Sequence, residues 1–260
     1  MDKKVDWGWR VMARKATLPI MVLGIWWWLT NVRGFGGGIL PTPHEFTAGL
    51  GRLITTGQLW RHISISLLRI GQGFGLAAGL AIPLGILVAA FPIFGQFVLP
   101  SLEFLRQIPP IAWIPVFILA LGIGEATKLA VIVYAAFFPV FMNTILGVTQ
   151  IDQHYWEVAR LLQFSKQETL RELIVPGAMA SLATGIRLGL SNSWRALVAA
   201  EMLAAVSGLG YMIMSARSLV RMDEVFIGIL VIGLLGTAFD WGCRVLEQHF
   251  LYWQKPEEDI

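Results

Sequence analysis

The sequence predicts an all-α polytopic membrane protein with about six transmembrane helices. Of its 260 residues, 56% are hydrophobic and only 14% are charged, whereas soluble domains carry about 25% charged residues. Long stretches carry no charge and match the roughly 20 residues that a helix needs to cross a bilayer. These stretches are 16–32, 70–102, 107–124 and 129–151. A β-barrel would instead show segments of about ten residues with strict alternation, which these continuous apolar runs lack.

The first predicted span covers 16–32 and follows a basic stretch, 2–15. A cleavable signal peptide has a short apolar core and a small-residue cleavage site. This apolar run instead continues through Trp26, Trp27 and Trp28, with no such site after it. We therefore expect an uncleaved first span whose N-terminus is cytoplasmic.

Five further spans follow from the remaining apolar runs, and six spans place both termini in the cytoplasm. The segment 152–172 carries Arg160, Lys166 and Arg171, and it lies inside in this topology, as the positive-inside tendency requires. The connections 33–61 and 207–224 are predicted to be external loops. The five spans are 62–90, 94–123, 129–148, 178–206 and 225–244.

The third span contains four prolines and cannot be one straight helix, because each proline removes a backbone donor. These are Pro100, Pro109, Pro110 and Pro115. We predict a break near 108–110. Carbonyls freed in lipid must be satisfied by neighbouring helices or by a water-filled cavity, so the break indicates either a lined passage or a packing kink.

Several classes of site are not supported by the sequence. The phosphate-binding pattern G-x-x-x-x-G-K-[ST] is absent, so ATP-driven work would need a nucleotide site on another chain. Cys243 is the only cysteine and the four histidines are scattered, which predicts neither a disulfide nor a metal site. The net charge of +3 is explained by cytoplasmic lysine and arginine rather than by nucleic-acid binding.

The polar segment 152–177 reads as helix, turn, helix. Val158, Leu161 and Leu162 form one apolar stripe, and Leu170, Leu173 and Ile174 form a second. Between the stripes, Ser165 and Glu168 have the spacing of a capping box, in which each side chain bonds the other residue's backbone N–H. Two such amphipathic helices could dock into a groove of a soluble partner, or they could pack on their own membrane domain.

This segment resembles the EAA motif of bacterial ABC-importer permeases. Glu157-Val158-Ala159 and Leu173-Ile174-Val175-Pro176-Gly177 have its order and spacing, although Val158 replaces an alanine and Leu173 stands at an isoleucine position. Gln163 stands where the family usually has the glycine of the turn. A non-glycine residue in a left-handed conformation costs about 1–2 kcal/mol.

Further stretches extend the resemblance over about 40–247, to the nitrate, sulfonate and taurine branch of these permeases. Each is short, and their order and spacing together make the match specific. They are 40–43, 59–62, 106–115, 117–125, 187–190, 199–201 and 208–211.

The resemblance implies a type I ABC importer (MetI-like) fold in a single transmembrane domain, 1–260, with a core at 62–247 and a coupling loop at 152–177. It implies a second permease subunit, most simply a homodimer, two ATPase subunits that carry ATP and magnesium, an external substrate-binding protein, and a bacterial inner membrane. The residues expected to couple to the ATPase are Glu157, Val158, Ala159, Gln163, Ser165, Glu168, Leu173, Pro176 and Gly177.

Ionisable residues at membrane depth are costly and normally face a bundle interior, which makes Arg195 and Glu201 candidates for the pathway. A cationic Arg195 would favour an anionic solute, unless Glu103, Glu125 or Glu201 pairs with it. Arg187 lies nearer the cytoplasmic end, where it could reach the interface or the coupling loop. Asp240 and Arg244 have the spacing of an intrahelical ion pair. The predicted pathway residues are Pro109, Pro110, Asn192, Trp194, Arg195 and Glu201.

These observations predict a permease subunit of an ABC importer for a small anionic solute such as a sulfonate, taurine or nitrate, without catalysis on this chain. One alternative is a stand-alone ion-coupled secondary transporter, which would usually show internal repeats and midplane acidic residues. Another is a membrane enzyme, which would need clustered polar side chains at one depth. The sequence shows neither pattern.

Overall fold

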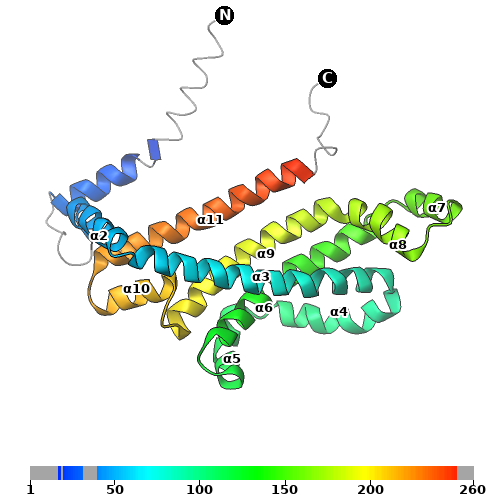
Figure 1. Cartoon of the computed structure of the whole chain (residues 1–260), viewed down its shortest axis with the longest axis horizontal. Coiled ribbons are helices and arrows are strands. Elements are labelled where there is room, and N and C mark those ends of the chain that lie inside the picture. The colour runs from blue at the N-terminus through cyan, green and yellow to red at the C-terminus, as the bar shows by residue number, and fades with distance from the viewer. Residues whose placement is uncertain (1–16, 19, 32–39, 251–260) are drawn as a thin grey trace, which may run out of the picture. The chain divides into compact units, whose positions relative to one another are not determined.

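The computed structural model describes residues 17, 18, 20–31 and 40–250, which are folded as helices and short connections (Figure 1). The chain divides into two compact units. Of the described residues, the first unit contains those up to Trp60 and Met212–Leu230, and the second contains Arg61–Tyr211 and those from Val231 onward.

The helices in chain order are α2 Pro43–Thr55, α3 Gln58–Ala90, α4 Pro92–Arg106, η1 Pro110–Trp113, α5 Ile114–Leu121, α6 Glu125–Thr149, α7 Gln153–Leu161, α8 Lys166–Glu168, η2 Thr169–Ile174, α9 Val175–Ala204, α10 Leu209–Ser218 and α11 Met222–Phe250.

Within the residues that the structure describes, four helical stretches are long and apolar enough to cross a membrane, and a bent pair makes up to five. They are α3, α6, the continuous stretch Lys166–Ala204, and Met222–His249. The predicted spans 62–90, 129–148, 178–206 and 225–244 all coincide with these helices. Of the predicted first span, the described helix Ile20–Asn31 is apolar but short, and residues 16, 19 and 32 lie outside the described residues, so this span stays a prediction.

The predicted break in the third span is confirmed. The two halves, Pro92–Arg106 and Pro110–Leu121, are bent by 91°. The hydroxyl of Tyr134 donates to the carbonyl oxygen of Leu105 and, at 3.2 Å, to that of Ile108. Carbonyls freed at the break are therefore satisfied by the neighbouring helix α6, as a non-helical segment at membrane depth requires.

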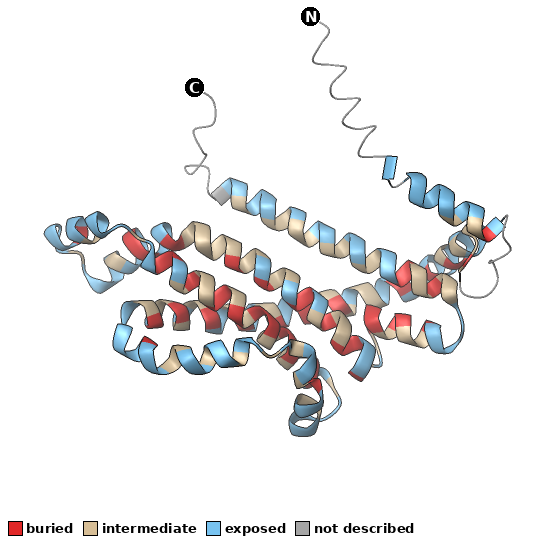
Figure 2. Ribbon diagram, turned by 180° about the vertical axis from the view of Figure 1, so that it is seen from behind, coloured by how far each residue is buried: buried red, intermediate tan, exposed pale blue. Residues whose placement is uncertain are grey.

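Helices α3, α6 and α9 lie side by side and form the core of the second unit, where buried residues concentrate (Figures 1 and 2). Small residues let the backbones approach closely, as is common between helices in membranes. A Cβ at Gly85 of α3 would lie 2.8 Å from the Thr144 side chain of α6, and one at Gly189 of α9 would lie 2.8 Å from Val140.

The expectation that 33–61 and 207–224 are loops is wrong, because α2 and α10 lie within them. Thr42 and Glu45 form a capping box at the start of α2, where Pro43 occupies the first turn. This helix buries Gly49 and Leu53. Both helices are too short to span a bilayer, so neither produces the apolar run of about 20 residues by which hydropathy predicts a span.

Candidate functional site

The segment 152–177 has the predicted helix-turn-helix arrangement in its first half. The side chain of Asp152 caps α7 by accepting from the His154 backbone N–H at 2.9 Å. Gln163 has a φ of +54° in the turn, the left-handed conformation that glycine adopts at least cost. The predicted capping box of Ser165 and Glu168 is confirmed. Hydrogen bonds from the Ser165 backbone N–H, and then from its side chain, lower the pKa of Glu168.

The second half differs from the expectation of a separate helix. After α8, residues Thr169–Ile174 form a π-helix that runs directly into α9, so one helical stretch extends from Lys166 to Ala204. The chain therefore has no loop between the end of the turn and the fifth span.

The first apolar stripe does not pack on the described part of the chain. Val158, Leu161 and Leu162 are 50%, 82% and 63% exposed, and Figure 2 shows α7 and α8 as largely exposed. Of the second stripe, Leu173 and Ile174 are instead buried, whereas Leu170 is 38% exposed. Packing on the chain's own membrane domain therefore describes two residues of the second stripe and none of the first.

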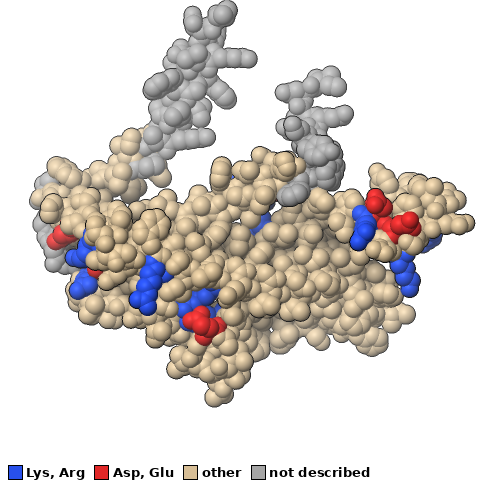
Figure 3. All heavy atoms as spheres, viewed as in Figure 1, with Lys and Arg blue, Asp and Glu red and all other residues tan. Residues whose placement is uncertain are grey.

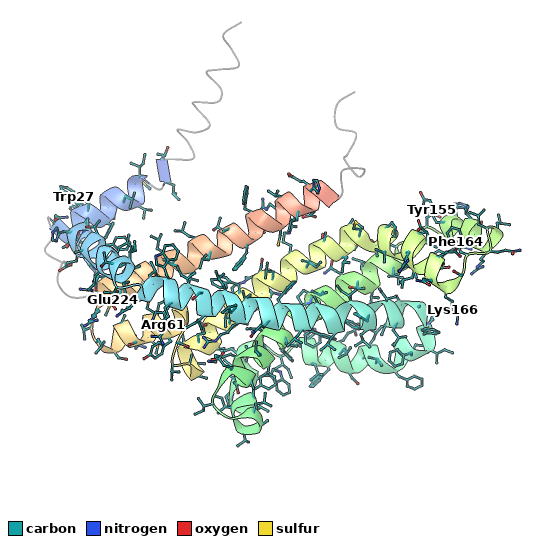
Figure 4. All side chains as sticks on the ribbon, viewed as in Figure 1. Trp27, Arg61, Tyr155, Phe164, Lys166 and Glu224 are labelled. Atoms are coloured by element: carbon teal, nitrogen blue, oxygen red, sulfur yellow. The ribbon has the colours of Figure 1, made fainter. Side chains whose placement is uncertain are left out.

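Polar residues surround this exposed stripe. Figure 3 shows a group of basic and acidic side chains over α7 and α8, separated by uncharged surface from other groups. Figure 4 places Tyr155, Phe164 and Lys166 together there. Glu157 is exposed, and its carboxylate lies 3.7 Å from the imidazole Nδ1 of His154. The last motif residues, Pro176 and Gly177, are exposed at the start of α9.

A cavity of about 620 Å³ lies in the second unit beside the break in the third span. Most of its lining is apolar, and the polar lining residues are Arg106, Tyr134, Asn143, Asn192 and Arg195. Several of these residues are exposed, so the cavity is open on one side.

Arg195 is held against its own helix at the cavity. Its Nε donates to the Ser191 carbonyl oxygen at 3.1 Å, and its Nη2 donates to Asn192 Oδ1 at 3.0 Å. Two carboxylates that could have cancelled the charge of Arg195 do not pair with it. Both Glu125 and Glu201 pair with Arg69 instead.

The sequence did not predict an ionic cluster centred on the buried Arg69, in which Glu201 is also buried and Glu125 is 61% exposed. The Arg69 guanidinium donates to Glu125 at 2.6 and 2.7 Å, to Glu201 at 2.8 Å, and to Ser207 at 2.7 and 2.8 Å. Lys128 donates to the same Glu125 carboxylate at 2.6 Å. The cluster joins α3, the start of α6 and the end of α9, at the side that the predicted topology places outside.

The Glu201 carboxylate is fully satisfied within this cluster. It accepts from the Ser66 hydroxyl at 2.8 and 2.9 Å and from the Gly210 backbone N–H at 3.0 Å. Gly208 has a φ of +107°, and a Cβ there would lie 2.2 Å from a Glu201 oxygen. Only glycine therefore fits at this turn beside the carboxylate.

The structure places three of the six predicted pathway residues at the cavity and three elsewhere. Pro110, Asn192 and Arg195 line the cavity, whereas Pro109, Trp194 and Glu201 are absent from its lining. Trp194 is buried, and its indole N–H donates to the Ile232 carbonyl oxygen at 3.3 Å. Arg187 pairs with Glu247 at 3.2 Å rather than with the segment 152–177, and the predicted pair of Asp240 and Arg244 is confirmed at 2.6 Å.

Comparison with known families decides the identity of this fold. Residues 81–252 match the family model described as binding-protein-dependent transport system inner membrane component. The chain belongs to this family. It is accordingly the multi-pass permease subunit of an ABC importer, and ATP is hydrolysed on a separate chain.

Several relatives carry names that state a transported solute, and three of them span the sulfonate, taurine and nitrate class. SsuC of Bacillus subtilis (strain 168), named as an aliphatic sulfonates transport permease protein, is 37% identical over 93% of this permease and 87% of SsuC. The taurine transport system permease protein TauC of Escherichia coli (strain K12) is 33% identical, with 97% and 94% covered. The nitrate import permease protein NrtB of Synechocystis sp. (strain PCC 6803) is 36% identical, with 90% and 87% covered.

A chain of the MetNI methionine ABC transporter in an inward-facing conformation has a similar structure. The TM-score is 0.59 at 16% sequence identity, and the match covers 72% of this permease and 95% of that chain. At this identity the likeness concerns the fold alone, and it supports the type I importer architecture.

Proposed function

We propose that this permease moves a small anionic solute of the sulfonate, taurine or nitrate type across a bacterial inner membrane, with both termini in the cytoplasm. Two copies would form the pathway, since homo-oligomers with two-fold symmetry are the most common assemblies. Two ATPase subunits with ATP and magnesium would bind the segment 152–177, and an external binding protein would deliver the solute. The names of the relatives support the solute class.

The observation that carries the proposed coupling is the exposure of Val158 and Leu161 on α7 and of Leu162 at its C-cap. On the cytoplasmic side these residues meet water, and exposed apolar stripes of this kind mark interaction sites. A groove on the ATPase would cover them as a helix-in-groove contact. Each fully buried leucine contributes about 1.5–3 kcal/mol.

The continuity of the helix from Lys166 to Ala204 supplies a mechanical route from this contact to the cavity. Asn192 and Arg195 lie on the same helix and line the cavity. When ATP binding moves the ATPase subunits, a displacement of α7 would pass through the short turn at Gln163 into this continuous helix and so reach the wall of the cavity. Hydrolysis would then reset it.

The test is copurification of the ATPase with the variant Leu161→Ser. We expect its affinity for the ATPase to fall about 10-fold or more, since 1.4 kcal/mol corresponds to a factor of ten. Leu219→Ser is the matched control, because Leu219 is 60% exposed but lies in the predicted external segment 207–224. Equal retention of the ATPase by Leu161→Ser, Leu219→Ser and the unchanged permease would contradict the proposed contact.

A second experiment separates the importer from an ion-coupled transporter. Proteoliposomes that contain the permease, its ATPase and its binding protein should take up solute only with ATP. Uptake by the permease alone under an ion gradient would instead support the secondary transporter.

A further inference from the structure

Of the arginines at membrane depth in this permease, all but two are neutralised by ion pairs with carboxylates. Five arginines lie within the predicted spans, namely Arg69, Arg106, Arg187, Arg195 and Arg244. Arg69 pairs with Glu125 and Glu201, Arg187 with Glu247, and Arg244 with Asp240.

Arg106 and Arg195 are the exceptions. Within the described residues, neither guanidinium has a carboxylate oxygen within 4.0 Å. This holds for Arg106 although Glu103 lies three residues away on the same helix, α4. An unpaired cation inside a membrane is costly and marks a functional position.

The same two arginines line one cavity. Arg106 comes from the end of α4 at the break, and Arg195 comes from the middle of α9. No aspartate or glutamate is among the lining residues, so the field of these two charges in the cavity is not cancelled locally. Asn192 accepts from Arg195 through its oxygen, which leaves its amide N–H groups as further donors.

The rest of the lining is apolar and includes Ile108, Ile111, Phe138, Met142 and Leu188. A cavity with two guanidinium groups and an apolar wall fits an amphiphilic anion, which has an oxyanion head and a hydrocarbon tail. Guanidinium groups bind planar or tetrahedral oxyanions through paired N–H donors. A bare inorganic anion would leave the apolar wall without a contact.

We propose that Arg106 and Arg195 form an oxyanion-binding site within the translocation pathway, and that the site accepts an alkanesulfonate in preference to an inorganic anion. The inference rests on the proposed function, because it assumes that the cavity belongs to the pathway. The site selects solute inside the membrane, in addition to the selection by the external binding protein. One competing explanation is that Glu103 of a second copy neutralises the two arginines.

The experiment uses the permease–ATPase complex in lipid nanodiscs without the binding protein. Titration calorimetry with sodium 1-butanesulfonate measures binding, and sodium nitrate and butyltrimethylammonium chloride are the comparison probes. We expect butanesulfonate to bind, nitrate to bind more weakly and to compete with it, and the cation not to bind. The competition arm needs only the unchanged protein, so it does not depend on the folding of any variant.

Variants then assign the binding to the two arginines. Arg106→Met and Arg195→Met should each weaken butanesulfonate binding about 10-fold or more, because a hydrogen bond to a charged group contributes about 1.5–3 kcal/mol. Arg106→Lys and Arg195→Lys should weaken butanesulfonate binding less, since lysine keeps the positive charge and loses only the paired N–H donors of the guanidinium. Arg244→Met is the matched control, because Arg244 pairs with Asp240 on α11 and does not line the cavity.

Three results would overturn the inference. The first is absence of butanesulfonate binding to the unchanged complex, and the second is binding that both methionine variants retain in full. The third is binding that appears only after Glu103→Gln, which would show that a partner carboxylate occupies the arginines. The proposed function is tested separately, by the copurification of the ATPase with Leu161→Ser. If that variant loses the ATPase while butanesulfonate binding fails as described, the oxyanion site is wrong and the proposed function stands.

Discussion

The buried ion pair of Arg69 and Glu201 leads to a prediction about Glu201→Gln. Glutamine has nearly the same shape as glutamate, so the substitution changes charge and hydrogen bonding without creating a cavity. The Arg69 and Glu201 side chains are only 4% and 0% exposed. The change therefore acts on groups that solvent does not reach.

The magnitude follows from the partners of the carboxylate. Ser66, Arg69 and Gly210 all donate to Glu201, and the amide nitrogen of glutamine would have to face one of these donors. The cluster holds two cations, Arg69 and Lys128, and two carboxylates, Glu125 and Glu201, so its formal charge would change from zero to +1. Removing one partner of a buried ion pair costs about 3–5 kcal/mol.

The assay is thermal unfolding of the purified permease in mild detergent. A loss of 1 kcal/mol lowers Tm by about 2–4 °C in a chain of 150–250 residues, so Glu201→Gln should lower the apparent Tm by on the order of 10 °C. Asp240→Asn is the control, because it breaks an ion pair whose Arg244 side chain is 62% exposed. Such a pair contributes less than about 1 kcal/mol. Equal Tm values for the two variants would refute the structural role assigned to the cluster.

Two further substitutions test local geometry. Gln163→Gly should relieve the strain of the left-handed turn, where φ is +54°. Trypsin should then cleave the permease in membrane vesicles more slowly at Arg160 and Lys166. Unchanged or faster cleavage would contradict this prediction. Gly189→Ala should lower the apparent Tm by several degrees, because its Cβ would lie 2.8 Å from Val140 and 3.1 Å from the Ala136 carbonyl oxygen, and overpacking costs about 1–3 kcal/mol. Gly79→Ala, whose Cβ would meet nothing within 4 Å, should leave the Tm nearly unchanged.

Features that depend on local sequence were predictable. Hydropathy located α3, α6, α9 and α11, and the prolines located the break at 108–110. The capping box of Ser165 and Glu168 and the pair of Asp240 and Arg244 also follow from spacing along one helix. In each case the interacting residues are within a few positions of each other, so a single sequence contains all the information required.

Features that depend on the rotation and contact of separate helices were not predictable. Arg69 and Glu201 are 132 positions apart, and nothing in one sequence indicates that α3 and α9 bring them together. For the same reason Glu201 was grouped with Arg195 in the pathway, although the structure buries one and leaves the other at the cavity. The signal that could have found the cluster is the isolated charge, since Arg69 and Glu125 each border an uncharged stretch.

The position of three sites on one helical stretch links the proposals physically. The segment next to α7 enters α9 through the π-helix Thr169–Ile174, Arg195 lies further along, and Glu201 lies near the end. At 1.5 Å per residue, Ile174 and Glu201 are about 40 Å apart. π-Helical turns within α-helices are rare and frequently lie at functional sites. This one would let the end that we propose to be cytoplasmic tilt while the ion pair with Arg69 holds the other end. The displacement would then be largest near the segment 152–177, which we propose binds the ATPase, and smaller at Arg195. The cavity at Arg195 could therefore change its opening without separation of the whole helix bundle.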